Sequence, residues 1–169
     1  MDELYILSGL LLEPDEETAF VIAELGRSWA WLGAAVAACA RVPLEAWREE
    51  YQRLFGDGGE GGECPARESA WLPDCNPLDL AALYRRAAIK THGKPSDFLA
   101  NQLAFAAWHL EQESSVDPAV WTVLWQRLSS WVPRFGRELR ERAELEIYRA
   151  LGSRLEILFG PSVSAAAIA

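Results

Sequence analysis

Apolar residues recur along most of this chain at the three- and four-residue spacing of amphipathic helices, and the alternation typical of strands is scarce. The first apolar stripe lies between Asp2 and Leu12. By the same spacing, further helices are predicted over residues 15–25, 29–40, 43–55, 76–92, 95–113 and 118–131, with one or two more between residues 133 and 158. The pattern predicts an all-α fold, a single compact multi-helix domain of about eight or nine helices over residues 1–160. Residues 161–169 are predicted to be a flexible C-terminal tail.

Capping residues and prolines set the predicted helix boundaries. Asn76, Pro77 and Asp79 combine an N-cap residue, a first-turn proline and a first-turn acid, a combination typical of a helix start. Asp15 is expected to cap the second helix in the same way. Pro133 lacks the backbone N–H that a helix interior requires, so we expect it to end or kink a helix near Trp131.

Residues 56–76 form the longest segment without helical periodicity. Its first half, from Gly56 to Glu63, is rich in glycine and contains three carboxylates. A phosphate-binding loop would end in Lys followed by Ser or Thr, and this first half contains no Lys, Ser or Thr. Its second half contains Trp71 and Leu72, which are unlike linker residues. A long loop in a compact domain is usually functional or disordered, and the apolar second half indicates order against the helices.

The charge and the absence of long apolar runs narrow the classes of partner. The 169-residue chain has a formal net charge of −9. This charge disfavours nucleic acids and anionic membranes, and it attracts basic peptides over long range. No apolar run reaches the roughly 18 residues of a membrane span, and the first residues are acidic, unlike a secretory signal. We therefore expect a cytoplasmic protein without stable membrane insertion.

Candidate catalytic and metal-binding residues are few. Cys39, Cys64 and Cys75 form no CxxC pair, which favours free thiols in a reducing compartment. His92 and His109 are the only histidines, and neither lies in an HExxH or ExxH pattern. The sequence also has no G-x-S-x-G nucleophile motif. We therefore predict a protein that is not an enzyme and that has no catalytic residues, metal site or cofactor.

Three short segments form a pattern that none of them establishes alone. They are Tyr51–Phe55, Cys64–Leu72 and Gly93–Leu99. The first ends a helix on which Trp47, Tyr51, Leu54 and Phe55 share one apolar face. Taken singly, Leu54 and Phe55 are explained as core residues and Glu68 as a solvated loop acid. Asp97 alone is explained as an acid that is favourable near a helix N-terminus.

In order and spacing, the three segments resemble the TorD/DmsD/NarJ family of redox-enzyme maturation chaperones, from about Trp47 to Leu151. Members of this family have a helix ending in Leu-Phe, a glycine-containing loop and a Pro-aromatic-Glu-Ser-Val-Trp-like segment. After another helix, Pro-x-Asp-His opens a helix that continues into an apolar stretch. The resemblance implies an all-helical cytoplasmic chaperone. It would bind the apo form of a molybdopterin-containing oxidoreductase, and in many members its twin-arginine signal peptide, and assist cofactor insertion and assembly before export. Carried over by residue, the binding surface would consist of Tyr51, Leu54, Phe55, Pro65, Glu68, Ser69, Trp71, Asp97 and Phe98.

The chain departs from the family pattern near this surface. Arg67 replaces the loop aromatic, Phe98 replaces the histidine after the aspartate, and Gln102 and Ala104 stand where later glutamates are common. The site therefore has fewer acids than that of a typical family member, and acids are the groups that would pair with leader arginines. Whether the leader or the mature part of the client is bound stays open. An alternative function is a helical adaptor or assembly subunit in a permanent complex. A monomer and a homodimer both remain open, and so does the client's identity.

Overall fold

The computed structural model describes residues 2–57, 60–87, 95–112, 118–161 and 163. Within these ranges the chain forms eight α-helices: α1 (Asp2–Gly9), α2 (Thr18–Ser28), α3 (Ala30–Cys39), α4 (Leu44–Phe55), α5 (Pro77–Arg86), α6 (Leu99–Glu111), α7 (Pro118–Arg142) and α8 (Glu146–Leu158). The segment without helical periodicity contains a short hairpin, β1 (Gly56–Asp57) with β2 (Glu60–Gly61), and a 3₁₀ helix, η1 (Glu68–Ala70). The predicted all-α fold class is confirmed.

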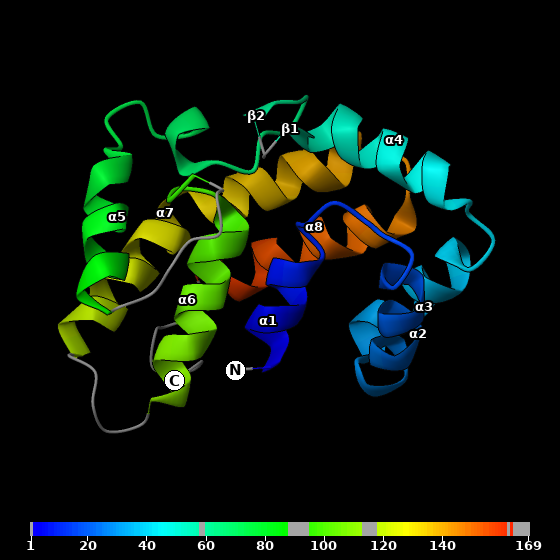
Figure 1. The fold of residues 1–169 in the computed structure, drawn as a ribbon, viewed down its shortest axis with the longest axis horizontal. Helices are drawn as coiled ribbons and strands as arrows, with labels where there is room; N and C mark the ends of the chain where they lie inside the picture. The colour runs from blue at the N-terminus through cyan, green and yellow to red at the C-terminus, as the bar shows by residue number, and fades with distance from the viewer. Residues whose placement is uncertain (1, 58–59, 88–94, 113–117, 162, 164–169) are drawn as a thin grey trace.

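The longest helix, α7, and α8 form the central pair, and the other helices pack around them (Figure 1). Helix α3 contacts α8, and α2 folds back on α3 as a hairpin at one end of the molecule. Helix α1 lies beside α6, and α5 lies at the end opposite the α2–α3 hairpin (Figure 1). Among the described residues, no helix has both the length and the apolar character needed to cross a bilayer.

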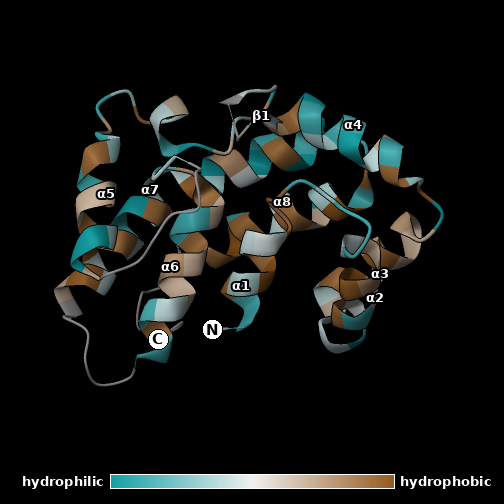
Figure 2. Cartoon of the chain, in the orientation of Figure 1, coloured by the Kyte–Doolittle hydropathy of each residue, from teal (hydrophilic) through white to brown (hydrophobic). Residues whose placement is uncertain are grey.

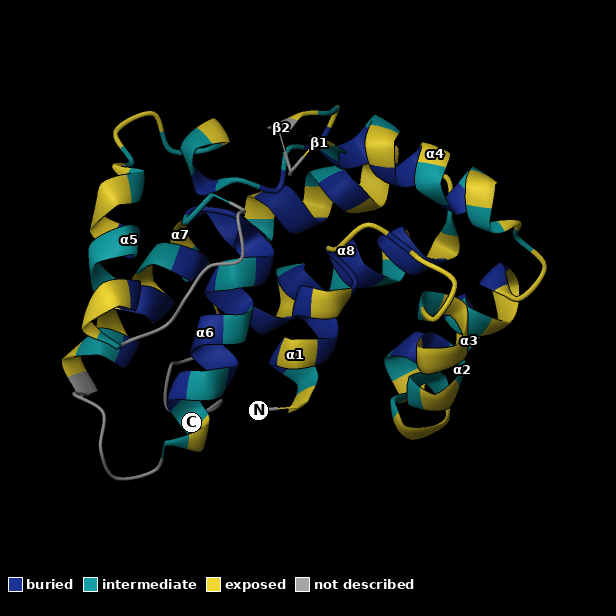
Figure 3. Cartoon of the chain, in the orientation of Figure 1, coloured by how far each residue is buried: buried dark blue, intermediate teal, exposed yellow. Residues whose placement is uncertain are grey.

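Aromatic side chains fill the core where α4 meets α7 and α8. The ring of Phe55 lies 5.2 Å from that of Tyr51, 5.4 Å from that of Tyr148 and 6.4 Å from that of Phe135, measured between centroids. Such aromatic pairs each contribute roughly 0.5–1.5 kcal/mol beyond their buried area. Hydrophobic and buried positions coincide along these helices, whereas α2 and α3 carry many exposed positions (Figures 2 and 3).

Two glycines let α7 and α8 come into backbone contact. A Cβ atom built on Gly136 would lie 2.6 Å from the Gly152 carbonyl oxygen, and one on Gly152 would lie 2.5 Å from the Gly136 carbonyl oxygen. Both distances are shorter than a non-bonded contact permits, so only glycine fits at either position. The pair therefore determines how closely the two central helices approach.

Helix α7 passes through Pro133, so of the two predicted outcomes near Trp131, an end or a kink of the helix, the end was wrong. An interior proline removes one backbone hydrogen bond and costs about 3 kcal/mol or more. Buried side chains on both sides of the proline, from Trp131 and Val132 to Phe135, offset this penalty by packing into the core. Tertiary packing thus overrides the local preference of proline.

The other helix boundaries follow the predicted caps with small shifts. The Asn76 side chain accepts a hydrogen bond from the Leu78 N–H at 3.1 Å, as expected for an N-cap. The Asp15 carboxylate accepts from the Thr18 N–H at 2.9 Å at the start of α2. Helix α1 ends at Gly9, earlier than predicted. The predicted helix end at His92 lies outside the described residues, as does most of the predicted tail.

Candidate functional site

The second half of the loop binds to the start of α6 through its backbone. The Glu68 N–H donates to the Asp97 carbonyl oxygen at 3.1 Å, and the Leu99 N–H donates to the Ala66 carbonyl oxygen at 2.9 Å. An antiparallel bridge pairs residues 67 and 98 between these bonds. We call residues 64–72 together with residues 97–99 the loop junction. It brings together six of the nine predicted site residues, namely Pro65, Glu68, Ser69, Trp71, Asp97 and Phe98.

Asp97 is fully buried at the centre of the loop junction and does not lie in a helix. It precedes α6, which begins at Leu99, so the prediction that this helix includes Asp97 was wrong. Its carboxylate accepts from the Ser69 hydroxyl at 2.6 Å and from the Arg67 guanidinium at 3.0 Å. Burial alone would raise the pKa of Asp97, but the bonds from Ser69 and Arg67 outweigh it and the pKa lies below its ordinary value. Asp97 is therefore ionised at neutral pH.

Glu68 is also buried and pairs with a different arginine. Its carboxylate lies 2.9 Å from the guanidinium of Arg127 on α7 and accepts from the Gln102 amide at 3.1 Å. The same Gln102 amide also donates to the Asp97 carbonyl oxygen at 3.1 Å. The expectation that Glu68 is a solvated loop acid, its explanation when taken alone, is therefore wrong. The two carboxylates tie the loop to both α6 and α7.

Trp71 is half-buried and held in a defined orientation. Its indole N–H donates to the Pro65 carbonyl oxygen at 2.8 Å, and its ring meets the edge of Phe135 with centroids 5.9 Å apart. The exposed Arg134 places its guanidinium carbon 5.3 Å from the ring centroid, a cation–π arrangement. Together with the half-buried Pro65 and Ser69, Trp71 belongs to the part of the loop junction that reaches solvent, as do Arg67, Ala70 and Leu72.

Besides the buried acids Glu68 and Asp97, four aromatic or aliphatic residues of the predicted nine lie in the core. Tyr51, Leu54, Phe55 and Phe98 have at most 1% of their surface exposed. The Tyr51 hydroxyl points inward and donates to the Leu11 carbonyl oxygen at 3.3 Å. In the described conformation these four side chains do not face solvent, although Phe98 itself belongs to the loop junction. Their contact with a client stays a prediction, and it would require α4 or α6 to move away from the core.

Arg127 and Gln102 complete the loop junction, but they were not among the predicted site residues. The sequence contains a signal for Arg127, which follows Leu124 by three positions and precedes Trp131 by four. Leu124 and Trp131 are buried, so this spacing places a cation on the apolar face of α7. A charge on a buried face requires a partner of opposite sign. That rule points to a buried acid, although it does not say which one.

Burial affects the thiols of Cys64 and Cys75 and the ring of His109, which are groups that often serve in catalysis. Burial raises the pKa of the Cys64 thiol to about 12 and that of the Cys75 thiol to about 11, so both stay protonated at neutral pH. The buried His109 ring stacks on Trp121 with centroids 6.1 Å apart. No group of three or more His, Cys, Asp or Glu side chains within the described ranges could hold a metal ion.

We expect slow thiol labelling of the native protein by Ellman's reagent at pH 8. A thiol with a pKa of about 11, as for Cys75, is ionised to only about 0.1% at that pH, against about 24% for an ordinary cysteine. Absorbance of the released thionitrobenzoate should show Cys75 reacting at least about a hundredfold more slowly than glutathione. In denaturant all three free cysteines should react fully. Labelling of Cys75 in the folded protein at the glutathione rate would contradict the burial of this thiol beside Glu68.

Comparisons with known proteins give the fold from a solved structure and the family from a sequence profile. A crystal structure of a candidate redox enzyme maturation protein from Archaeoglobus fulgidus superimposes with a TM-score of 0.66 at 21% sequence identity, covering 92% of this chain and 93% of that chain. This similarity shows a shared fold. Comparison with curated protein sequences finds no significant match. The sequence profile of the nitrate reductase delta subunit family matches residues 21–137, more than half of the chain. The chain therefore belongs to the nitrate reductase delta subunit family, which confirms its resemblance to the TorD/DmsD/NarJ maturation chaperones.

Proposed function

We propose that this protein is a cytoplasmic chaperone that binds the apo form of a molybdopterin-containing oxidoreductase and assists cofactor insertion and assembly before export. Its membership of the nitrate reductase delta subunit family carries the proposal. Protonated thiols and the lack of a metal-binding cluster among the described residues fit a binding protein better than an enzyme. In this proposal the cofactor belongs to the client, and the chaperone itself carries no catalytic group.

The client contacts the solvent-exposed side of the loop junction, formed by Pro65, Ser69, Trp71 and the neighbouring Arg134. An aromatic ring held by a hydrogen bond loses little side-chain freedom on binding, which favours affinity. The buried carboxylates of Glu68 and Asp97 position this surface and do not contact the client. Their role is to hold the loop in one conformation through their arginine partners.

A twin-arginine leader is a further ligand in this proposal, but we place its arginines away from the loop junction. Both carboxylates there are already paired within the chain, Asp97 with Arg67 and Glu68 with Arg127. A leader arginine would have to replace one of these partners and break a buried, hydrogen-bonded pair, which typically costs about 3–5 kcal/mol. The mature part of the client can bind without displacing Arg67 or Arg127, and it fits the aromatic, exposed side of the loop junction.

Affinity capture with the tagged protein, followed by mass spectrometry, tests the function. We expect recovery of the precursor of a molybdenum oxidoreductase that lacks its cofactor, as shown by metal analysis of the eluted complex. Recovery of only the mature, cofactor-loaded enzyme would support the alternative, a permanent adaptor or assembly subunit. A failure to recover any oxidoreductase from the native host would contradict both functions.

Trp71→Ala should weaken capture of the client about tenfold, equivalent to about 1.4 kcal/mol, because it removes the aromatic anchor of the exposed surface. The matched control is Trp108→Ala, a half-buried tryptophan on α6 that stacks on Phe105 away from the loop junction. Titration of both variants with the purified client, together with their thermal melting, separates binding from stability. Equal client affinity for Trp71→Ala and the wild type would exclude this surface as the contact.

A further inference from the structure

Arg134 on α7 is an exposed cation whose charge is not matched by an acid of the chain. Among the residues that the structure describes, no carboxylate forms an ion pair with it. The nearest acid by helical spacing is Glu138, one turn further along α7, and its carboxylate accepts from the Arg142 guanidinium at 2.8 and 3.0 Å. Arg137, three positions after Arg134, pairs with Glu156 at 3.2 Å. The charge of Arg134 is therefore available to a partner.

The position of Arg134 over Trp71 brings this charge to the solvent-exposed side of the loop junction. The guanidinium carbon lies 5.3 Å from the ring centroid, and the indole N–H holds the ring in place through its bond to the Pro65 carbonyl oxygen. A guanidinium carries its N–H donors in its own plane, so a ring that contacts its face leaves these donors free to bind a carboxylate. The ring and the charge together form a surface with an apolar part and a cationic part.

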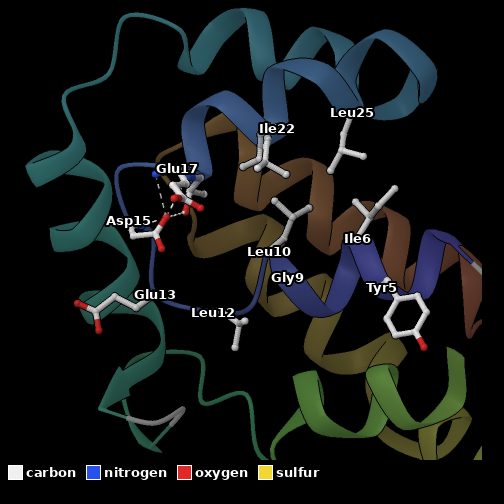
Figure 4. Close-up of a pocket in the computed structure, with 12 residues that line it drawn as sticks. Tyr5, Ile6, Gly9, Leu10, Leu12, Glu13, Asp15, Glu17, Ile22 and Leu25 are labelled. Atoms are coloured by element: carbon white, nitrogen blue, oxygen red, sulfur yellow. Dashed lines mark hydrogen bonds between the residues drawn. The ribbon is translucent and has the colours of Figure 1, made fainter. Parts of the chain in front are cut away.

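The acids of the loop junction do not neutralise Arg134, because each of them is buried against another arginine. Asp97 pairs with Arg67 at 3.0 Å and Glu68 pairs with Arg127 at 2.9 Å. A group of exposed acids lies instead at one end of a groove of about 430 Å³ between α1 and α2 (Figure 4), namely Glu13, Asp15 and Glu17. This groove shares no residue with the loop junction. The chain is acidic as a whole, yet the loop junction presents a positive charge to solvent.

We infer that the exposed side of the loop junction binds a client segment in which an aspartate or glutamate lies next to an aromatic or aliphatic residue, an inference that rests on the proposed function. The client carboxylate accepts from the Arg134 guanidinium, and the apolar residue packs against Trp71 and Pro65. A charge at the edge of an interface selects the partner more than it adds affinity. Arg134 therefore favours acidic segments and repels arginine-rich ones, which agrees with a leader site away from the loop junction.

Arg134→Glu and Arg27→Glu form a matched pair of variants. Each replaces an exposed arginine by an acid, so each removes one positive charge, adds one negative charge and moves the net charge from −9 to −11. Both variants therefore repel an acidic ligand similarly over long range. Arg27 lies in the last turn of α2, in the hairpin opposite α5, whereas Arg134 lies at the loop junction (Figure 1). Arg134→Lys keeps the positive charge, and circular dichroism should show the same helicity for all three variants and the wild type.

The probe is a rhodamine-labelled synthetic peptide in which two aspartates flank two phenylalanines between glycine and serine residues, and its partner peptide has asparagines in place of the aspartates. Fluorescence anisotropy at low salt measures the binding of both. We expect saturable binding of the acidic probe to the wild type, about three- to tenfold tighter than binding of the asparagine peptide. The net charge of the protein opposes this preference, so the preference has to come from a local contact. Arg134→Glu should abolish or reverse it, whereas Arg27→Glu and Arg134→Lys should keep most of it, and high salt should reduce it.

Equal affinity of the wild type for the two peptides would overturn the inference, as would a lack of saturable binding of the acidic probe. An equal preference for the acidic probe in Arg134→Glu and Arg27→Glu would overturn it as well, because the preference would then not depend on the loop junction.

Capture of the apo client by the same proteins separates this inference from the proposed function. Weaker capture by Arg134→Glu than by Arg27→Glu supports a client acid at the loop junction. Equal capture by these two variants overturns the inference and leaves the chaperone function intact. A wild type that captures no apo client overturns the proposed function, even if the probe binds.

Discussion

Replacing Asp97 by alanine is expected to lower the free energy of unfolding by about 3–5 kcal/mol, because it removes a buried carboxylate from a hydrogen-bonded ion pair. The change deletes the acceptor of the bonds from the Ser69 hydroxyl at 2.6 Å and the Arg67 guanidinium at 3.0 Å. Ser69 and Arg67 belong to the loop, so the loop should detach from α6 before the remaining helices unfold. Urea unfolding at pH 7, followed by tryptophan fluorescence, measures the difference.

The control for Asp97→Ala is an exposed ion pair of the same kind. Glu24 on α2 lies 2.8 Å from Arg27, and both side chains are largely exposed. Glu24→Ala should change the free energy of unfolding by less than about 1 kcal/mol, the usual range for a surface pair. If Asp97→Ala unfolds at the wild-type urea concentration yet no longer binds the client, Asp97 contacts the client directly, as the family resemblance implied.

Lowering the pH should remove the difference by which the unfolding free energy of the wild type exceeds that of Asp97→Asn. The pKa of Asp97 in the folded protein is below its ordinary value, because bonds from Ser69 and Arg67 outweigh the opposing effect of burial. A carboxyl group with a depressed pKa contributes stability that is fully present above its unfolded pKa of about 3.9 and is lost as the pH falls through its folded pKa. The difference in unfolding free energy should therefore be constant from pH 7 to about pH 5 and shrink below about pH 4. A constant difference down to pH 2 would contradict the assignment.

Replacing Gly152 by valine should abolish the native packing of α7 on α8, with a loss of about 4 kcal/mol or more. Even the first carbon of the new side chain would lie 2.5 Å from the Gly136 carbonyl oxygen and 2.7 Å from the Arg140 backbone nitrogen. These atoms belong to the backbone of α7 and cannot rotate away as a flexible side chain would. The two helices would have to separate, which exposes the aromatic core around Phe55 and Phe135.

Gly9→Val is the matched control for Gly152→Val, since both put a β-branched residue at a glycine in a helix. Open space surrounds the Gly9 position within 4 Å, so the control should change the free energy of unfolding by less than about 1 kcal/mol. Thermal melting followed by circular dichroism compares the two. A Gly152→Val variant that melts within a few degrees of the wild type would show that the helices separate at little cost.

The sequence by itself determined the helices and most of their inward faces. The spacing of Trp47, Tyr51, Leu54 and Phe55 predicts one face of α4, and all four are buried. The start of α5 at Asn76 was predictable, because N-cap chemistry depends on only a few neighbouring residues. Such signals are local, and helix formation responds to them directly. The family motifs were equally visible, since they are short segments in a fixed order.

The tertiary structure alone decided the partners of the charged residues and which apolar side chains stay exposed. Sequence spacing cannot show that Asp97 pairs with Arg67 or that Glu68 pairs with Arg127, because these residues meet only after distant segments pack. The continuation of α7 through Pro133 depends on the buried side chains around it, which outweigh a local penalty. Tyr5 on α1 and Val21 on α2 remain partly exposed beside a groove of about 430 Å³ between these helices. A hydrophobic pattern predicts which residues are favourable to bury, but only the packing of the helices decides which of them remain exposed.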